Sequence, residues 1–367
     1  PKPSSAASDV YKRQELNYGI IGNCKSSALI NEDSSIDWCC LPQFDSPSVF
    51  GKILDENIGG QFKISCNDDY TILQFYIENT SILCTRFSNG YDAFEVIDYM
   101  PRYKKDNNVY YSPPEITRIL KHIKGAPKYR VIYDPRLEYA VGETKNYVKK
   151  HFLVSVVDDK NYDTLFLYTD LDKNAILNAT ELTLTQDHFM SVSYNEKIET
   201  PTLDHTLFEF ERTKVYWLNW CHKTPSFKQY NEEILRSAMT LKLLTFEKTG
   251  AVLAAATTSL PETIGEVRNW DYRFCWIRDA SMVIKVIAKL GHTQIVKNFI
   301  SYIIDLVHDK NEKLQIMYGI SGEKTLSEET LEHLNGYKGS KPVRCLLYTS
   351  DAADEGLGVD LGGRRII

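Results

Sequence analysis

The sequence lacks any apolar stretch that approaches the roughly 20 residues needed to cross a bilayer, because polar residues interrupt its longest apolar runs. It also lacks an excess of one charge: 43 Lys and Arg against 49 Asp and Glu give a net charge of −6 at pH 7, with both signs interspersed. No basic stripe is available for a nucleic-acid backbone or an anionic lipid surface. We therefore predict a soluble protein that binds neither nucleic acid nor membrane.

Cysteine is present, but without a Cys-x-x-Cys pair or a spacing to histidine that is typical of metal ligands. Buried free thiols are the expected state, which favours a reducing, cytoplasmic location. We expect no metal and no organic cofactor. What the sequence does have is 367 residues with 43% hydrophobic content, enough for one large or two ordinary packed domains.

The two ends of the chain are unusual. Residues 4–14 have neither the apolar region of a signal peptide nor a helical or strand period. One back-translation of them, read on the opposite strand one base along, encodes residues 345–354. We therefore expect residues 1–14 and 345–367 to derive from a transposase sequencing adapter, and the native insert to run from Glu15 to Arg344.

From Asn17 to about Thr206 the sequence alternates short β-branched and aromatic runs with turn residues, a pattern typical of an antiparallel sandwich or barrel. A small helix is expected at Val49–Leu54. The expected strands are Ala28–Ile30, Ile36–Leu41, Gln61–Ser65, Thr71–Ile77, Ser81–Phe87, Ala93–Tyr99, Ile116–Ile123, Tyr129–Tyr133, Tyr147–Val157, Thr164–Thr169 and Phe189–Tyr194.

After Pro201 the apolar period becomes helical. The helices are expected at Phe208–His222, at Tyr230–Phe246, from about Trp276 to Gly291, and from Thr293 to about Val307. Gly291 is the expected C-terminal cap of the third helix and Thr293 the N-cap of the fourth. Beyond residue 311 a glycine-containing loop follows, so strands come first and helices second, which predicts two domains rather than a βαβ sheet.

The segment Arg268–Asp279 concentrates two Trp, three Arg and two Asp just before a helix. Aromatic rings can stack on the C–H faces of a sugar, and planar charged groups can pair with adjacent hydroxyls, so this composition fits a carbohydrate subsite. A structural reading stays open from the residues alone: Trp270 and Trp276 as core anchors, Arg273 paired with Asp271, and Asp279 at a helix N-terminus.

Three segments carry a family resemblance, namely Tyr18–Asn23 with Ser35–Phe50, Arg268–Asp279, and Met317–Ile320 with Gly336–Arg344. In this order they resemble glycoside hydrolase family 15, the glucoamylase and trehalase family, with a trehalase-like N-terminal domain. Gln43, Lys338 and Lys341 depart from the family pattern, which has arginine there. Arg and Lys differ in donor geometry, so these contacts need not be the same.

The resemblance implies a multidomain β-then-α fold: an N-terminal antiparallel β-sandwich followed by the beginning of an incomplete (α/α)6 barrel. The expected boundaries are residues 15–206 for the sandwich, 207–229 for a helical linker and 230–344 for the first part of the barrel. Apolar stripes on the last helices would then lack partners, and we expect the fragment to be poorly soluble.

For the site, the resemblance implies that Trp276, Arg278 and Asp279 hold the non-reducing glucose. Tyr318 and Tyr337 are weaker candidates, and Asp37, Trp38 and Asp45 are expected to be structural. Such enzymes hydrolyse an α-glucoside (a maltooligosaccharide or trehalose) with inversion, through two carboxyl groups that flank a water. Both glutamates are expected after Arg344, which predicts that this chain is inactive.

Three further points complete the expectations. Glu328, Glu329 and Glu332 lie in a polar stretch and are expected to be solvated rather than catalytic. The alternative function is a non-catalytic regulatory relative with the same barrel, such as a phosphorylase kinase regulatory subunit. A stand-alone carbohydrate-binding sandwich is disfavoured by the amphipathic helices and the Trp-Ile-Arg-Asp motif that ends at Asp279.

Overall fold

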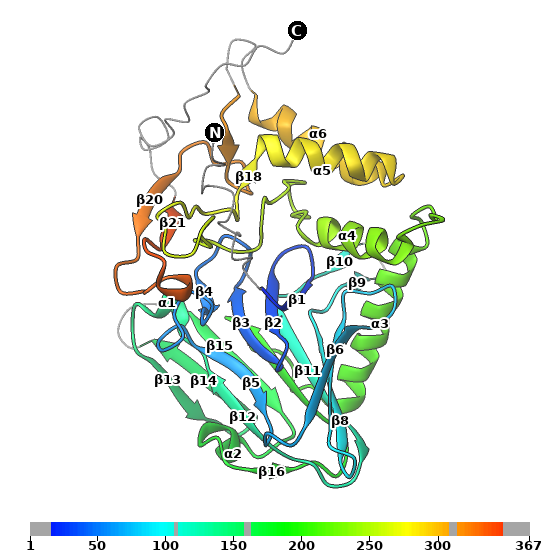
Figure 1. The fold of residues 1–367 in the computed structure, drawn as a ribbon, viewed down its shortest axis with the longest axis vertical. Coiled ribbons are helices and arrows are strands. Elements are labelled where there is room, and N and C mark those ends of the chain that lie inside the picture. Colours follow the sequence, from blue (N-terminus) through cyan, green and yellow to red (C-terminus); the bar gives the residue numbers. More distant parts are fainter. Residues whose placement is uncertain (1–15, 106–108, 158–162, 308–313, 348–367) are drawn as a thin grey trace, which may run out of the picture.

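The structure is a computed structural model that describes residues 16–105, 109–157, 163–307 and 314–347. The expected adapter-derived segment 1–14 lies outside the described residues, and so does 348–367, whereas 345–347 end a short strand. Strands occupy the chain as far as residue 194, and longer helices follow (Figure 1). The predicted order of β first and α second is confirmed.

Two antiparallel sheets form the strand region. The spatial order of the first is β1 (Tyr18–Gly22), β2 (Ser27–Asn31), β3 (Ser35–Cys40), β5 (Gln61–Ser65), β12 (Lys128–Asp134) and β16 (Leu182–Thr183), with β4 (Ser48–Phe50) also paired to β3. The order of the second is β13 (Thr144–Val148), β14 (Phe152–Val157), β15 (Thr164–Thr169), β17 (His188–Tyr194), β11 (Glu115–Lys124), β8 (Ala93–Tyr99), β7 (Leu83–Ser88) and β6 (Thr71–Tyr76).

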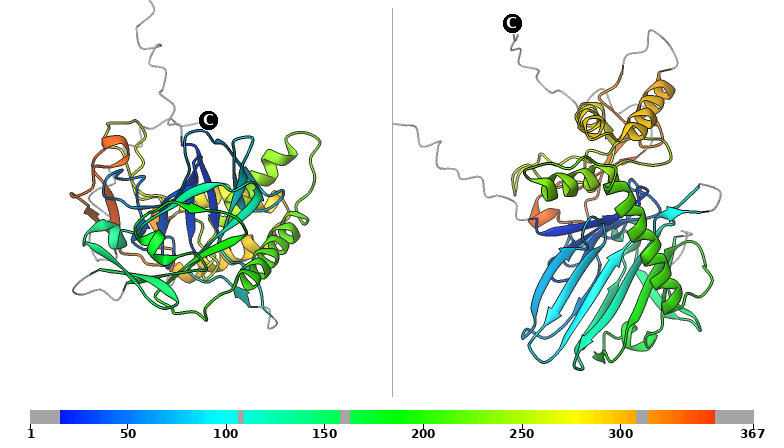
Figure 2. Two further views of the ribbon diagram at one scale, coloured as in Figure 1. Left: turned by 90° about the horizontal axis from the view of Figure 1, so that it is seen from below. Right: turned by 90° about the vertical axis from the view of Figure 1, so that its right-hand side faces the viewer.

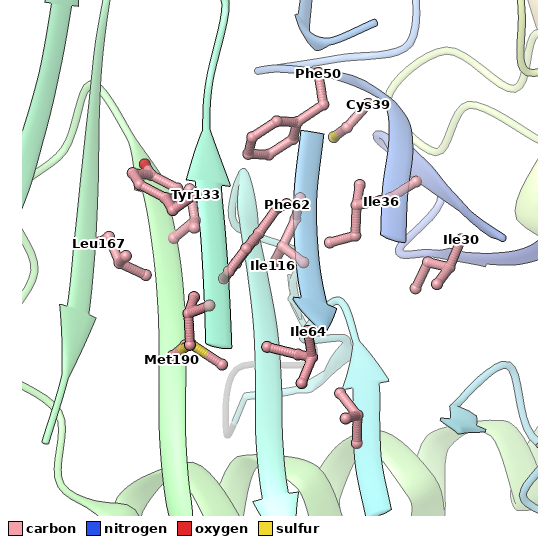
Figure 3. Packing of buried hydrophobic residues seen from close by; sticks show 14 of the residues in the cluster. Ile30, Ile36, Cys39, Phe50, Phe62, Ile64, Ile116, Tyr133, Leu167 and Met190 are labelled. Carbon is pink, nitrogen blue, oxygen red and sulfur yellow. The ribbon is translucent and has the colours of Figure 1, made fainter. Parts of the chain in front are cut away.

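Apolar side chains from both sheets meet in one core. Alternate residues of a strand face opposite sides, so Phe62 and Ile64 of β5 point inward together. Figure 3 shows them packed near Ile116 of β11 and Met190 of β17, both from the second sheet. This is a sandwich core, one of the two architectures that the spacing of the apolar runs indicates.

A buried arginine of the second sheet, paired with an aspartate of the neighbouring strand, also bonds the first sheet. Arg118 Nε donates to Asp98 Oδ1 at 2.7 Å, and both side chains are fully buried. The same guanidinium donates to the carbonyl oxygens of Phe62 and Ser34 in the first sheet. Burial raises the pKa of Asp98, against the opposing effect of Arg118.

The expected strands lie close to the observed ones, β1 (Tyr18–Gly22) is not among the expected runs, and two expectations are corrected. The run Tyr147–Val157 is not one strand but the end of β13 and all of β14, because the chain reverses at 149–151, where Lys149 N donates to Phe152 O. The expected helix at Val49–Leu54 is wrong. Residues 48–50 form β4, which pairs with β3, and a turn follows.

Short elements complete the strand region. They are the two-stranded sheet of β9 (Tyr103–Lys104) and β10 (Tyr110–Tyr111) and the short helices α1 (Leu137–Ala140) and α2 (Lys173–Leu177). The helix α3 (Leu203–Cys221) then runs along one side of the sandwich (Figure 2). It begins five residues before the expected Phe208 because Thr202 Oγ1 accepts a hydrogen bond from His205 N and caps it.

Three further helices lie beyond one end of the sandwich: α4 (Asn231–Leu243), α5 (Ile277–Lys289) and α6 (Thr293–Leu306). Gly291 follows α5 with φ +82°, as expected for a C-terminal cap. Thr293 is not the N-cap of α6. That position is taken by His292, whose side chain forms no capping hydrogen bond, and Thr293 is the first helical residue.

The segment after α6 is not a plain loop. It contains β19 (Met317–Tyr318), β20 (Ser327–Thr330), β21 (Arg344–Leu347) and the single turn η2 (Tyr337–Gly339). The β19 strand pairs with β18 (Cys275–Trp276), and β20 pairs with β21. The first ladder ties the segment back to the start of α5, and the second closes the segment on itself.

Specific contacts join the sandwich to the helical region. The Trp38 indole of β3 donates to Ala256 O at 2.7 Å, and Arg102 Nη1 pairs with Glu247 Oε2 at 2.6 Å. Trp38 and Arg102 are both buried, so these bonds are shielded from water. The two regions are therefore packed against each other rather than joined only by a linker.

Candidate carbohydrate site

The candidate site begins where β18 runs into α5. Cys275 pairs with Tyr318 in the β18–β19 ladder, and Ile277 N donates to Ile316 O at 3.0 Å. The short ladder therefore brings the segment Met317–Ile320 beside the segment Arg268–Asp279. Tyr318 is buried, and its hydroxyl accepts a hydrogen bond from Gln315 N at 2.8 Å. The structure thus places Tyr318 opposite Cys275, with its hydroxyl oxygen accepting a hydrogen bond from its own loop.

Trp276 occupies the N-cap position of α5 and is 8% exposed. Its Nε1 lies 3.4 Å from Asp271 O, and its ring lies 5.8 Å from that of Tyr272 at 37°. The indole is therefore held from two sides. A fixed ring orientation is what a stacking surface for a sugar requires.

Arg278 and Asp279 lie in the first turn of α5 and are open to solvent. Arg278 Nη2 and Nε donate to the same oxygen, Asp279 Oδ2, at 3.0 and 3.2 Å. Their side chains are 67% and 36% exposed. The helix N-terminus favours the negative charge of Asp279, and the unused donors and acceptors of the pair face water.

Behind this exposed pair lies a buried one. Arg273 Nε and Nη2 donate to Asp271 Oδ1 and Oδ2 at 2.9 and 2.6 Å, and both side chains are fully buried. Arg273 Nη1 also donates to Ser46 O at 2.8 Å, and the guanidinium lies over the rings of Trp38 and Tyr139. The predicted Arg273–Asp271 pairing is confirmed, and it fastens the motif to the sandwich.

Trp270 does not serve as a core anchor. It is half-buried, and the Arg344 guanidinium lies 4.8 Å from its ring centroid. Arg344 also forms an ion pair with Glu328. Glu328, Glu329 and Glu332 are all exposed, in agreement with the solvated stretch expected there.

Tyr337 lies apart from the other candidates. It is 6% exposed and packs in a cluster with Trp38, Tyr139 and Leu334, whereas Tyr318 belongs to the core of the helical region. The structure therefore places Trp276, Arg278 and Asp279 in sequence at the start of α5, Tyr318 opposite Cys275 in the core of the helical region, and Tyr337 against the sandwich.

Tyr337 instead lines a polar cleft of about 560 Å³, between the edge of the first sheet and η2, that the sequence does not reveal. A second cleft, of about 610 Å³, lies between α3 and the β9–β10 pair. Neither is lined by Trp276, Arg278 or Asp279. Asp37, taken from the sequence as structural, lines the polar cleft, and only the fold shows that Tyr18 lies beside it.

The cysteines are reduced and mostly buried. All eight cysteines are free thiols, seven of them buried and Cys66 half-buried. Burial raises the pKa of several, to about 12 for Cys40 and about 11 for Cys275. Within the part of the chain that the structure describes, no three His, Cys, Asp or Glu side chains gather as metal ligands, and no helix has the length and apolar content to span a bilayer.

Comparisons with known proteins define the class. Residues 228–346 match the family of glycosyl hydrolases family 15, and residues 14–159 match the trehalase-like N-terminal family. The resemblance to glycoside hydrolase family 15, with a trehalase-like N-terminal part, is therefore confirmed in both regions and in the expected order.

Individual relatives are consistent with this. The chain is 32% identical to a trehalase of Thermoplasma volcanium and 31% identical to one of Mycolicibacterium smegmatis, over 89% of its own length in each case. It is 29% identical to trehalase 1 of Sulfolobus acidocaldarius over 94% of its length. The matches cover 52%, 53% and 58% of these relatives, so the chain spans about half the length of the curated relatives it matches.

Proposed function

We propose that the complete protein is a glycoside hydrolase that cleaves an α-glucosidic bond with inversion, and that its substrate is trehalose or a short maltooligosaccharide. The observation that carries the proposal is the open Arg278–Asp279 pair beside the fixed Trp276 ring. A guanidinium and a carboxylate on one helix turn can bind adjacent hydroxyls of one glucose, while the indole faces the C–H surface.

The trehalase relatives support the same class of substrate. In our proposal Trp276, Arg278 and Asp279 bind the non-reducing glucose, and Tyr318 shapes the wall behind them. The two acidic residues of the Arg268–Asp279 segment are each paired with an arginine, Asp271 with Arg273 and Asp279 with Arg278, and in our proposal Asp279 binds sugar hydroxyls rather than acting as acid or base. We therefore place the general acid and the general base in the part of the complete protein that follows Arg344, and propose that this chain by itself is inactive.

We further propose that α4, α5 and α6 begin an (α/α)6 barrel. Apolar side chains that stand free on α5 and α6 support this, since Met282, Ile300 and Ile304 are 63%, 50% and 65% exposed. In a closed ring of helices such residues would pack against neighbours. An (α/α)6 barrel that lacks its remaining helices would leave these side chains exposed.

The test is to recover the reading frame across Arg344 from source DNA without transposase fragmentation, and to assay the complete protein on trehalose and maltose. We expect glucose release, and proton NMR should show β-glucose from the non-reducing end of maltose and equal initial amounts of α- and β-glucose from trehalose, whose leaving glucose keeps its α configuration. Asp279→Asn should lose at least 100-fold in kcat/KM. Initial release of α-glucose alone from trehalose, with no β-glucose, would refute inversion. A complete protein that binds sugar without cleaving it would favour the regulatory alternative.

A further inference from the structure

The polar cleft beside Tyr337 has a volume typical of a small-molecule site, since such sites span roughly 300–1,000 Å³. One wall is the first sheet with the turn that follows β4. The other is η2 and the residues just before it. Its lining residues are Tyr18, Asn31, Asp37, Lys52, Ile53, Asp55, Glu56, Asn57, Asn335, Gly336, Tyr337, Lys338 and Gly339.

The sheet side of the cleft is held rigid by a buried carboxylate. Asp37 is 3% exposed and accepts hydrogen bonds from the Tyr18 hydroxyl and from Asn31 Nδ2, both at 3.0 Å. Ser35 Oγ donates to its other oxygen. Lys52 Nζ is oriented at the side by Gln61 Oε1 at 2.7 Å. These polar groups are therefore positioned before any ligand arrives.

The opposite wall is equally fixed. Asn335 N donates to Asp55 Oδ2 at 3.0 Å, which fastens this wall to the sheet side. Gly336 has φ +79°, and a Cβ there would lie 2.0 Å from Ser340 O, so only glycine fits. Asn269 Nδ2 donates to the same Ser340 O, so the turn is also tied to the Arg268–Asp279 motif.

Tyr337 supplies the ring and the free hydroxyl of this wall. Its side chain is 6% exposed and lines the cleft. No residue that the structure describes hydrogen-bonds its hydroxyl, in contrast to the Tyr18 hydroxyl across the cleft, which is held by Asp37. A tyrosine that is packed along its ring and unbonded at its tip is ready to bond a ligand.

The charge of the lining excludes strongly charged ligands. Two cations, Lys52 and Lys338, face three carboxylates, Asp37, Asp55 and Glu56, so neither an anion nor a bare cation is favoured across the whole surface. Many alternating donors and acceptors with two tyrosine rings suit an uncharged ligand rich in hydroxyl groups.

We propose that this cleft is a second carbohydrate site, distinct from the Trp276 subsite, that binds an uncharged mono- or disaccharide. Lys52 and Asn57 contact ring hydroxyls, and the Tyr337 hydroxyl completes the set. The site does not depend on the proposed hydrolytic activity, since its residues come from the sandwich and η2 and none belongs to the α5 turn.

The experiment uses this chain and measures dissociation constants for trehalose, maltose and glucose by ligand-observed NMR, with glycerol as a small polyol. Tyr337→Phe deletes one unbonded hydroxyl and is expected to weaken sugar binding about three- to tenfold. Lys52→Met, which keeps most of the aliphatic stem, is expected to weaken it similarly. Tyr91→Phe is the matched control, because Tyr91 is 84% exposed on the β7–β8 turn.

Arg278→Ala separates the two sites. If the cleft binds sugar, this variant retains the binding event that Tyr337→Phe weakens. Sugar binding that is abolished by Arg278→Ala and unaffected by Tyr337→Phe and Lys52→Met would overturn the second site and leave the proposed function standing. The second site would also be overturned if none of the three sugars binds, or if glycerol binds with the same free energy per hydroxyl group as the sugars.

Discussion

Two arginines five positions apart in one motif have opposite environments. Arg273 is fully buried against Asp271 and Ser46 O, whereas Arg278 is largely exposed and pairs with its neighbour Asp279. An exposed pair gains little net free energy, because water already solvates both charges. Breaking a buried pair instead leaves a charge without compensation.

We therefore predict that Arg273→Met lowers the free energy of unfolding by about 3–5 kcal/mol, while Arg278→Met changes it by less than about 0.5 kcal/mol. Urea denaturation followed by tryptophan fluorescence measures both. The double variant Arg273→Met/Asp271→Leu should recover part of the loss, since no unpaired carboxylate remains. Equal losses in the two single variants would show that the Arg273 pair does not hold the motif.

These residues also show where the sequence is informative. The Arg273–Asp271 pair is one of two interpretations of the Arg268–Asp279 segment, and the adjoining helix follows from its apolar period, because both depend on neighbours in sequence. It does not predict that Trp270 lies under Arg344, or that Tyr337 faces Tyr18 and Asp37. Those contacts join segments more than 70 residues apart, and a local pattern carries no information about them.

At the scale of elements, α3 packs on the second sheet over a buried acidic cluster. Glu115 of β11 and Glu209 of α3 are 4% and 8% exposed, and Tyr103 Oη donates to Glu209 Oε1 at 3.0 Å. Burial, followed by the charges of Glu209 and Glu196, raises the pKa of Glu115 to about 8, against the opposing effect of Lys105. Burial raises the pKa of Glu209 as well.

This cluster makes the docking of α3 sensitive to pH. The folded-state pKa of Glu115 lies above its unfolded value, so folding favours the neutral carboxyl. The contribution of this carboxyl to the free energy of unfolding is fully present below about pH 4.5 and is lost as the pH rises through about 8. We predict that ionisation of Glu115 lowers the free energy of unfolding by on the order of 3 kcal/mol between pH 5 and pH 8.

Glu115→Gln should remove most of that fall and raise the melting temperature at pH 8, as thermal denaturation at a series of pH values would measure. Glu211→Gln is the control, because Glu211 lies on the exposed side of the same helix. An unchanged pH profile in Glu115→Gln would mean that Glu115 is ionised in the folded protein at neutral pH.

The elements themselves were predicted unevenly, for physical reasons. Strands such as β5, β8 and β15 have the expected bounds because β-branched and aromatic residues alternate between turn residues. The sequence does not predict the reversal between β13 and β14, because the turn consists of Lys149, Lys150 and His151 and contains no Gly, Pro, Asn, Asp or Ser. The expected helix at 49–54 was wrong because pairing with β3 overrides a short apolar run.

At the scale of the whole molecule, the helical region presents an apolar face with no partner among the described residues. Ile300 and Ile304 of α6 are 50% and 65% exposed, whereas Ile295 on the same helix is 6% exposed. Exposed apolar surface of this kind promotes self-association.

We predict that Ile300→Lys/Ile304→Lys increases the soluble concentration of this chain several-fold, with a change in unfolding free energy within about 0.5 kcal/mol. Ile295→Lys should instead cost more than about 3 kcal/mol, because it buries an unpaired charge. Dynamic light scattering and the concentration left after ultracentrifugation measure the first effect, and denaturation the second. No gain in solubility would place the association surface elsewhere.

The hydrogen bond from the Trp38 indole to Ala256 O has a consequence for how the chain is made. The donor and the acceptor are 218 residues apart, so a ribosome working at roughly 5–20 residues per second delivers the acceptor about 10–40 s after the donor. Until then the central strand β3 carries a polar group that the finished core buries. The nascent sandwich must therefore either hold water at that position or remain partly open until the helical region emerges.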